Sequence, residues 1–179
     1  MKNTDKKKLH IGCGRDIKKG YVNLDFLNQP GVDVVHDMNK LPWPFKDNTF
    51  DEVYGEHILE HVDLISTMKE IHRICKKGAL IKVRGPHFSC GVSYRDPTHK
   101  TLFSYFIFDY FSNEKDYYKR TERGLFKIKK RRLNFTRFAF TPLNKIFNPL
   151  INLNPSIYER FFCWILPCSE VLFELEVLK

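Results

Sequence analysis

LHIGCGRDIKKGYVNLD, residues 9–25, is the stretch that decides the fold. Its apolar start leads into Gly12, Cys13 and Gly14, and a second apolar run ends in Asp25. A Gly-x-Gly turn after the first strand of a parallel sheet removes side chains where a ligand must approach the backbone. An acid at the end of the next strand is then placed to accept hydrogen bonds from ribose hydroxyls. Because no third glycine follows, this is not the dinucleotide fingerprint, and by itself the stretch also fits a tight strand-to-turn joint.

Short strands alternate with helical or turn signals through the rest of the first half. Runs of β-branched and apolar residues predict strands at residues 21–25, 32–37, 50–54 and 79–86. Residues 63–78 carry apolar side chains at helical spacing, with Asp63 placed as the N-cap and Gly78 as the residue that ends the helix. This alternation predicts an α/β protein with a mostly parallel sheet covered by helices.

The second half follows a different pattern. Residues 102–113 (LFSYFIFDYFSN) are expected to form an amphipathic helix. Alternating residues predict strands in 124–138 and 171–179, and these two strands fit an antiparallel pair at one sheet edge. We expect a single domain over residues 1–179, and its predicted parts are a basic tail at 1–8 and acceptor-side or lid insertions at 87–124 and 137–169.

The composition limits the classes of protein to which the chain can belong. The chain has 179 residues, 42% of them hydrophobic and 15% aromatic, which predicts one domain with one core. No apolar segment follows the start MKNTDKKK, and no uncharged apolar run reaches the roughly 20 residues of a membrane span. The five cysteines show no metal-like spacing, so we expect reduced thiols and a cytoplasmic protein. The net charge of +9 favours an anionic partner.

Four motifs follow one another in the first half: LHIGCG at 9–14, NLD at 23–25, HDMNKLPWPFKDNTFDEVYGEHILEHV at 36–62 and MKEIHRICKKGALIKVRGPH at 68–87. In this order they resemble the class I S-adenosylmethionine-dependent methyltransferases, and within them the methyltransferase type 11-like family. The resemblance implies a Rossmann-like sandwich with a mostly parallel sheet and an antiparallel C-terminal strand pair. It also implies an enzyme that uses S-adenosyl-L-methionine and releases S-adenosyl-L-homocysteine.

The resemblance assigns the glycine loop and the acid after it. Gly12 and Gly14 would frame the loop under the methionine part of the cofactor, and Cys13 would contribute backbone. Asp25 would hold the ribose hydroxyls. The connection from Gly14 to Asp25 covers only 11 positions, which leaves room for no more than a very short helix in the place where the family has one.

The same resemblance assigns the adenine side of the site. Asp37 would accept a hydrogen bond from the adenine amino group, the Met38 amide would face the ring, and Leu41 would pack nearby. Glu56 and His57 follow the fourth strand, where this family lines the cleft for cofactor and acceptor.

A rival motif overlaps this region. HILEH, His57 to His61, matches the H-x-x-E-H pattern of zinc proteases, and two histidines at i and i+4 on a helix can share a metal. The resemblance interprets the same residues as a junction between a strand and a helix, in which His61 and Glu60 pack against neighbours or cap the helix. We therefore predict no metal.

Methyl transfer needs alignment of the acceptor and, for a hydroxyl acceptor, a base that takes its proton. The candidates are His99, His87, His57 and Asp96, with His99 favoured and His87 second. His87 follows the fifth strand, and Asp96 and His99 lie in the loop beyond, on the side where open α/β sheets bind ligands. Each histidine also fits a plain surface or hydrogen-bonded role, and Asp96 also fits a turn before proline.

Two further surfaces stay open to interpretation. The basic stripe consists of Lys119, Arg120, Arg123, Lys127, Lys129, Lys130, Arg131 and Arg132. It fits attraction of an anionic acceptor, an anionic lipid head group or RNA, and equally the solvated face of an edge strand. The segment IYERFFCWILP at 157–167 is expected first in the core, with a lid, an oligomer contact or a membrane-surface helix as alternatives.

These observations predict a methyltransferase for a small-molecule or glycan-type acceptor, which could be a nucleotide-linked sugar, with oxygen as the methylated atom. One alternative is an RNA or nucleotide methyltransferase that uses the basic stripe at 119–132. A second alternative is a partner subunit that binds S-adenosylmethionine without catalysis.

Overall fold

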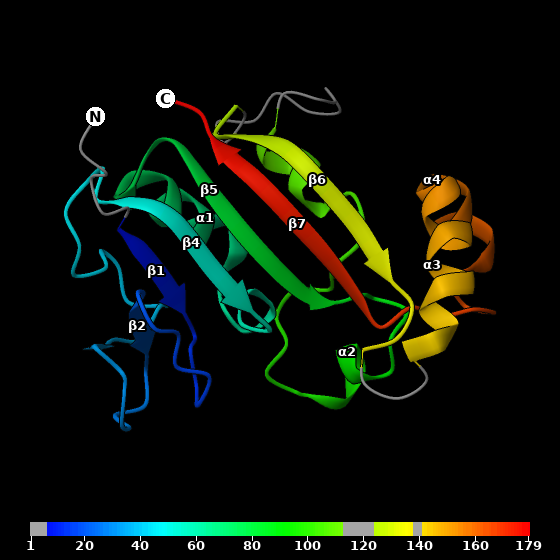
Figure 1. Ribbon diagram of the computed structural model, residues 1–179, viewed down its shortest axis with the longest axis horizontal. Coiled ribbons are helices and arrows are strands. Elements are labelled where there is room, and N and C mark those ends of the chain that lie inside the picture. The colour runs from blue at the N-terminus through cyan, green and yellow to red at the C-terminus, as the bar shows by residue number, and fades with distance from the viewer. Residues whose placement is uncertain (1–6, 113–123, 138–140) are drawn as a thin grey trace.

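A seven-stranded sheet forms the centre of the chain. The computed structural model describes residues 7–112, 124–137 and 141–179. The strand order is β3-β2-β1-β4-β5-β7-β6 (Figure 1). The strands are β1 (Lys8–Ile11), β2 (Val22–Asp25), β3 (Val34–Val35), β4 (Phe50–Glu56), β5 (Cys75–Pro86), β6 (Phe126–Asn134) and β7 (Glu170–Val177).

The strands β1 to β5 are parallel, and β7 lies antiparallel to both β5 and β6. The predicted α/β architecture, with a mostly parallel sheet and an antiparallel C-terminal pair at one edge, is therefore confirmed. Because β7 runs opposite to β5, the chain enters β7 at the sheet edge where β1, β4 and β5 end (Figure 1). Open α/β sheets bind ligands at that edge.

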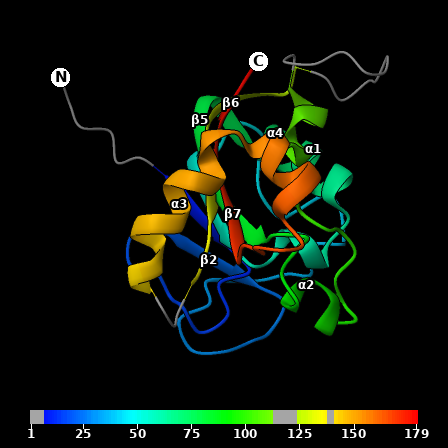
Figure 2. The ribbon, with the colours of Figure 1, turned by 90° about the vertical axis from the view of Figure 1, so that its right-hand side faces the viewer.

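One face of the sheet is buried against a helix. Alternate residues of the central strands, such as Ile11, Val53 and Ile81, are fully buried. They share one core with apolar residues of α1 (Leu64–Ile74), and Figure 2 shows α1 on one side of the strands. The apolar spacing that predicts this helix therefore supplies the face that covers the sheet.

The opposite face of the sheet is polar. One cross-strand row runs from His10 through Tyr54 and Lys82 to Glu174, and the Lys82 ammonium lies 3.1 Å from a carboxylate oxygen of Glu52. Within the described residues that precede β4 there is no helix, because short turns connect β1, β2 and β3. The prediction that helices cover the parallel sheet is thus wrong for this face. The alternating pattern of its strands places charged side chains there instead.

The start of α1 is as predicted and its end is not. The Asp63 carboxylate accepts the backbone N–H of Ser66 at 2.8 Å, so Asp63 is the N-cap. The helix ends at Ile74, and Cys75 already begins β5, whereas Gly78 lies inside that strand. Ile74 and Cys75 are both fully buried. The chain therefore turns into the sheet at once, before it reaches the glycine that the sequence offers as a stop.

The helix predicted for residues 102–113 is largely absent from the part of this range that the structure describes. A short 3-10 helix, η2 (Ile107–Phe111), is formed instead. Phe103 pairs with His87 in an isolated β-bridge and is buried, which holds the start of this segment extended. Phe108 and Phe111 are buried three residues apart, a spacing that the tighter helix satisfies.

The 3-10 helix η1 (Leu59–His61) follows β4, and the two predicted insertions carry the remaining helices of the described residues: α2 (Val92–Arg95), η3 (Thr141–Leu143), α3 (Asn144–Leu153), α4 (Pro155–Ile157) and the π-helix η4 (Tyr158–Phe162). The last three lie beyond the end of β6 (Figure 1). Their role on the acceptor side, like the predicted domain limits, stays a prediction. Over the described residues, no helix combines the length and the apolar character that crossing a bilayer requires.

Removal of Glu70 is expected to destabilise the fold by about 3 kcal/mol. Glu70 is buried, and its carboxylate accepts the N–H of Trp43 at 2.7 Å and the Nε–H of Arg73 at 2.9 Å. Glu70→Ala leaves both donors without this acceptor, and the free energy of unfolding can be measured in urea by tryptophan fluorescence. The matched control is Asp47→Ala, which removes only an exposed partner of Arg73 and should cost less than about 1 kcal/mol. Equal losses in the two variants would contradict this account.

Candidate functional site

The glycine loop after β1 is closed onto the end of β2. Gly12 has φ of +60°, and a Cβ there would lie 2.3 Å from a side-chain carbon of Ile58. Gly14, with φ of +52°, donates its N–H to Oδ2 of Asp25 at 2.8 Å. The N–H of Cys13 donates to the Leu24 carbonyl at 3.1 Å. Glycine is thus required at position 12 by conformation and by space, as the loop pattern predicts.

Asp25 is buried and ends β2. Besides the Gly14 N–H, its carboxylate accepts the N–H of Leu27 on Oδ1 at 3.0 Å. A carboxylate has about four lone-pair sites, so this one retains acceptor capacity toward a ligand. Its backbone bonds also fix its position before any ligand arrives.

A cavity of about 530 Å³ opens beside this carboxylate. It is lined by Gly12, Asp25, Phe26, His36, Asp37, Met38, Asn39, His57, Ile58, His61, Val62 and Thr98. The lining comes mainly from residues at and after the carboxyl ends of β1 to β4, where this kind of sheet binds ligands. The volume is in the range of small-molecule and cofactor sites. Five predicted cofactor residues, Gly12, Asp25, Asp37, Met38 and His57, are brought together here.

The segment after β3 forms the side of the cavity assigned to adenine. Asp37 accepts the N–H of Asn39 at 3.0 Å, and the hydrogen bonds from Asn39 lower the pKa of Asp37. Met38 is buried, and its carbonyl accepts the indole N–H of Trp43 at 3.0 Å. Leu41, also assigned to this side, is 47% exposed and does not line the cavity, and its packing near the adenine stays a prediction.

His57 is held between two carboxylates. Its Nε2 lies 2.7 Å from Oε1 of Glu170, and its Nδ1 lies 3.3 Å from Oε1 of Glu60. Burial alone would lower the pKa of His57, but the hydrogen bonds to Glu170 and Glu60 outweigh burial and raise it. Because a carboxylate faces each ring nitrogen, neither nitrogen is left to accept a proton from a substrate, and His57 is poorly suited to act as a base.

His61 also lines the cavity, and its ring contacts a hydroxyl that is itself bonded to a carboxylate. The Thr98 hydroxyl donates to Oδ1 of Asp96 at 2.6 Å, which leaves its oxygen to accept from Nδ1 of His61 at 2.8 Å. This arrangement assigns the proton of a neutral His61 to Nδ1 and leaves Nε2 as an acceptor. The predicted Asp96 thus acts on the site through Thr98 and His61, and its pKa is lowered by the hydrogen bonds from Thr98.

His99 lies beside His61, with the ring centroids 4.7 Å apart. Its Nδ1 lies 3.1 Å from the carbonyl of Ser93, so it is oriented in the same manner. His99 does not line the cavity itself. Sequence reasoning missed His61 and Thr98 as site residues, although the HILEH and RDPTH stretches contain them, because nothing in the sequence shows that the two stretches meet.

Two further predicted residues lie away from the cavity. His87 is fully buried, with Nδ1 2.8 Å from the Ser89 hydroxyl and Nε2 3.0 Å from a Glu159 oxygen, so it ties the end of β5 to η4. Glu56 pairs with Arg84 and Arg137 and does not line the cavity. Both side chains are used in internal pairs, and the predicted base role of His87 and cofactor-lining role of Glu56 stay predictions.

The HILEH stretch does not form the helical zinc pattern. Only Leu59 to His61 are helical, as the 3-10 helix η1, and His57 is engaged by carboxylates. A different set, Glu60, His61 and His99, has ligand atoms within 4.8 Å of one another. By distance this set could hold a metal ion, so metal dependence needs its own test.

The basic stripe is partly neutralised on β6. Lys129 lies 2.9 Å from Glu176, Lys130 lies 3.7 Å from Glu174, and Arg131 pairs with Asp109 at 2.5 Å. The predicted position on an edge strand is confirmed, since β6 ends the sheet order. Lys119, Arg120 and Arg123 lie outside the described residues.

Comparison with known proteins agrees with this geometry. Residues 13–83 match a family model described as a methyltransferase domain. An uncharacterized protein of Methanocaldococcus jannaschii is 54% identical over 46 residues, which are 25% of this chain. The matched stretch is 20% of that relative, so the chain spans only a fifth of the curated protein that it matches.

Solved structures share the fold over nearly the whole chain. A SAM-dependent methyltransferase from Archaeoglobus fulgidus superposes with a TM-score of 0.58 and 16% identity, over 96% of this chain and 86% of that one. A Haloferax volcanii complex of a methyltransferase with the Trm112 methyltransferase activator contains a chain with a TM-score of 0.56 and 14% identity, over 98% and 84%. Residues 13–83 thus match a methyltransferase domain, and the chain as a whole shares the fold of S-adenosylmethionine-dependent methyltransferases.

Proposed function

We propose that the chain moves the methyl group of S-adenosylmethionine to a hydroxyl oxygen of a small-molecule or glycan-type acceptor. The observation that carries this proposal is one cavity that joins two kinds of group. Gly12, Asp25 and Asp37, which are assigned to the cofactor, line the same cavity as His61 and Thr98, which are not. A methyl donor held by the first set would lie beside a base from the second.

The residues present suit the cofactor. Asp25 offers spare acceptor sites for two ribose hydroxyls, and the bare backbone at Gly12 permits close approach of a ligand. S-adenosylmethionine, when bound, supplies an electrophilic methyl group on a sulfonium. The chain itself must align the acceptor oxygen with that methyl group and must accept the proton of the acceptor hydroxyl.

We assign the proton acceptor to Nε2 of His61. In such a transfer, Nε2 of His61 would take the hydroxyl proton while the acceptor oxygen replaces sulfur on the methyl carbon, so that S-adenosylhomocysteine would be the second product. Thr98 and Asp96 act as positioning residues, because they hold the His61 ring in the tautomer that leaves Nε2 free.

A transfer assay with S-adenosylmethionine labelled on its methyl group tests the proposal. Nucleotide-linked sugars come first, then free glycans, small hydroxy acids and RNA, with S-adenosylhomocysteine and labelled product both measured. Label in a sugar or small-molecule hydroxyl supports the proposal. Label in RNA alone, with steep salt dependence, would overturn it in favour of the basic stripe.

The partner-subunit alternative gains some support from one comparison, because the Haloferax volcanii neighbour is a complex with a methyltransferase activator. Cofactor binding without S-adenosylhomocysteine production, for any acceptor, would favour that alternative. The assay is therefore run on a chain already shown to bind the cofactor.

Chelation is expected to leave the transfer rate unchanged, within about twofold, if Nε2 of His61 is a base. A divalent ion held by Glu60, His61 and His99 would occupy that nitrogen and make the rate depend on metal. Turnover is measured after dialysis against EDTA, and again after addition of Zn²⁺, Mn²⁺ or Mg²⁺. Loss of activity on chelation, with recovery on one metal, would contradict the assignment of His61 as the base.

A further inference from the structure

The segment from α3 to the start of β7 presents large apolar side chains to solvent. The most exposed are Leu153 (85%), Ile165 (79%), Trp164 (65%), Ile146 (60%), Phe161 (60%) and Leu150 (58%), which we call the apolar face. The expectation that residues 157–167 pack in the core is wrong for most of this segment. Only Tyr158 and Cys163 are buried within it and anchor the segment, whereas Phe161, Phe162, Trp164 and Ile165 are exposed.

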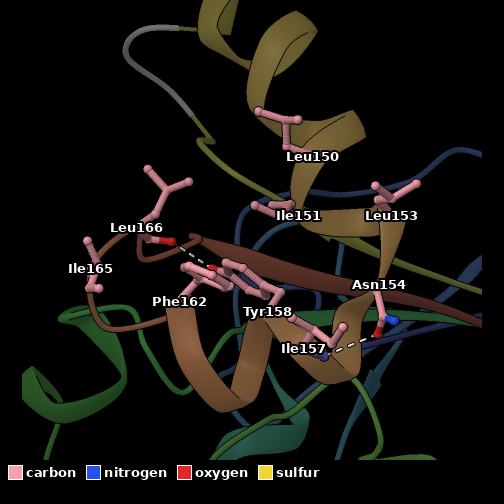
Figure 3. Close-up of a pocket in the computed structure, with 9 residues that line it drawn as sticks. All are labelled: Leu150, Ile151, Leu153, Asn154, Ile157, Tyr158, Phe162, Ile165 and Leu166. Atoms are coloured by element: carbon pink, nitrogen blue, oxygen red, sulfur yellow. Dashed lines mark hydrogen bonds between the residues drawn. The ribbon is translucent and has the colours of Figure 1, made fainter.

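A cavity of about 360 Å³ lies within this face (Figure 3). Two polar atoms beside it are already engaged: Oδ1 of Asn154 accepts the Ile157 N–H at 3.1 Å, and the Tyr158 hydroxyl donates to the Leu166 carbonyl at 2.8 Å (Figure 3). The other lining residues labelled in Figure 3 are apolar. A sugar or nucleotide would find few partners here and would be desolvated at a cost, whereas a hydrocarbon chain would not.

The charged side chains that this segment exposes to solvent are positive. Between residues 142 and 167 the charged side chains are Lys145, Glu159 and Arg160. Glu159 is turned inward, where it accepts the Tyr105 N–H at 2.5 Å and lies 3.0 Å from Nε2 of His87. Lys145 and Arg160 are exposed. An apolar face flanked by cations, with its carboxylate turned inside, is the charge pattern of helices that lie on anionic bilayers.

We infer that the apolar face binds the surface of an anionic lipid bilayer. Trp164 suits the headgroup level, where amphipathic aromatic rings concentrate. A second copy of the chain fits less well, because a two-fold contact through this face would bring Lys145 and Arg160 toward their own copies. The inference does not rest on the proposed methyl acceptor. Binding to a bilayer would, however, hold the sheet edge at which β1, β4 and β5 end close to the lipid. The reason is that the segment follows the end of β6 and leads into β7 (Figure 1).

Co-sedimentation with vesicles tests the inference without cofactor or acceptor. Wild-type protein is expected to partition into phosphatidylglycerol vesicles at least tenfold more strongly than into phosphatidylcholine vesicles. Leu153→Glu and Ile165→Glu, each at a highly exposed position, should lower partitioning at least tenfold. The matched control is Val35→Glu, at a position that is 51% exposed and lies on β3 at the other edge of the sheet. It should bind as wild type.

Tryptophan emission gives a second readout. Trp43 is buried and Trp164 is exposed, so a blue shift on vesicles should come from Trp164 and disappear in Trp164→Phe. Absence of sedimentation with phosphatidylglycerol, or equal binding by Leu153→Glu and wild type, would overturn the inference. A third result would also overturn it: the wild-type protein does not bind vesicles, light scattering shows that it is a dimer, and Ile165→Glu abolishes the dimer. A second copy of the chain would then cover the apolar face. Failure of the methyl-transfer proposal leaves each of these outcomes unchanged.

Discussion

His61→Ala is expected to lower kcat for methyl transfer by about 100- to 10,000-fold, the range of a general base. The binding of S-adenosylmethionine should change little, because the side chain of His61 lies on the acceptor side of the cavity in the proposed mechanism. Single-turnover rates with labelled cofactor measure the effect apart from product release. Thr98→Val keeps the size of the side chain but removes the hydroxyl that orients the ring, so a smaller loss of about tenfold and an altered pH profile of kcat are expected.

The neighbouring histidine provides the control. His99→Ala leaves the cavity lining intact, since His99 packs against His61 without reaching the cavity. A modest decrease in kcat is expected from this variant. If His99→Ala removes activity while His61→Ala retains it, the base is His99 and our assignment is wrong.

Asp25→Ala is expected to weaken S-adenosylmethionine binding by at least about 100-fold. Two hydrogen bonds from ribose hydroxyls to a carboxylate would be lost, each worth about 1.5 kcal/mol or more. The variant also frees the Gly14 N–H and the Leu27 N–H, which loosens the glycine loop. Calorimetric titration gives the change in Kd, and a thermal melt of the same sample shows whether the fold survives.

Asp16→Ala is the matched control for this loop. Asp16 lies two residues after Gly14 and is exposed, and its carboxylate pairs with Lys18 instead of lining the cavity. The same loss of negative charge should leave the affinity within about twofold. Equal weakening by Asp16→Ala and Asp25→Ala would mean that net charge, and not the ribose contact, controls binding.

The sequence predicts those parts of the site that lie close together along the chain. The Gly12 to Asp25 stretch and the Asp63 cap are local patterns, in which residue type, spacing and backbone conformation determine one another. The pairs that define the chemistry are not local. His61 meets Thr98 across 37 positions and His57 meets Glu170 across 113, and no periodicity in the sequence links either pair.

Two features of the fold could not be predicted for a related reason. The alternating charges of β4, β5 and β7 are compatible with a solvated face or with a face covered by other elements, and only the structure shows that turns, and not helices, connect β1, β2 and β3. Likewise, apolar side chains at helical spacing in residues 144–165 fit a core helix or an exposed one. The outcome depends on which other elements are left to cover these residues, and the described chain buries them only at Asn148, Ile151, Tyr158 and Cys163.

A crystal structure of the chain with S-adenosylhomocysteine tests the central claim most directly. The account predicts the ribose hydroxyls within about 3 Å of the Asp25 carboxylate, the adenine beside Asp37 and Met38, and the sulfur facing the side of the cavity that holds His61. S-adenosylhomocysteine bound elsewhere, or with its adenine away from Asp37 and Met38, would contradict the proposed site and the mechanism built on it.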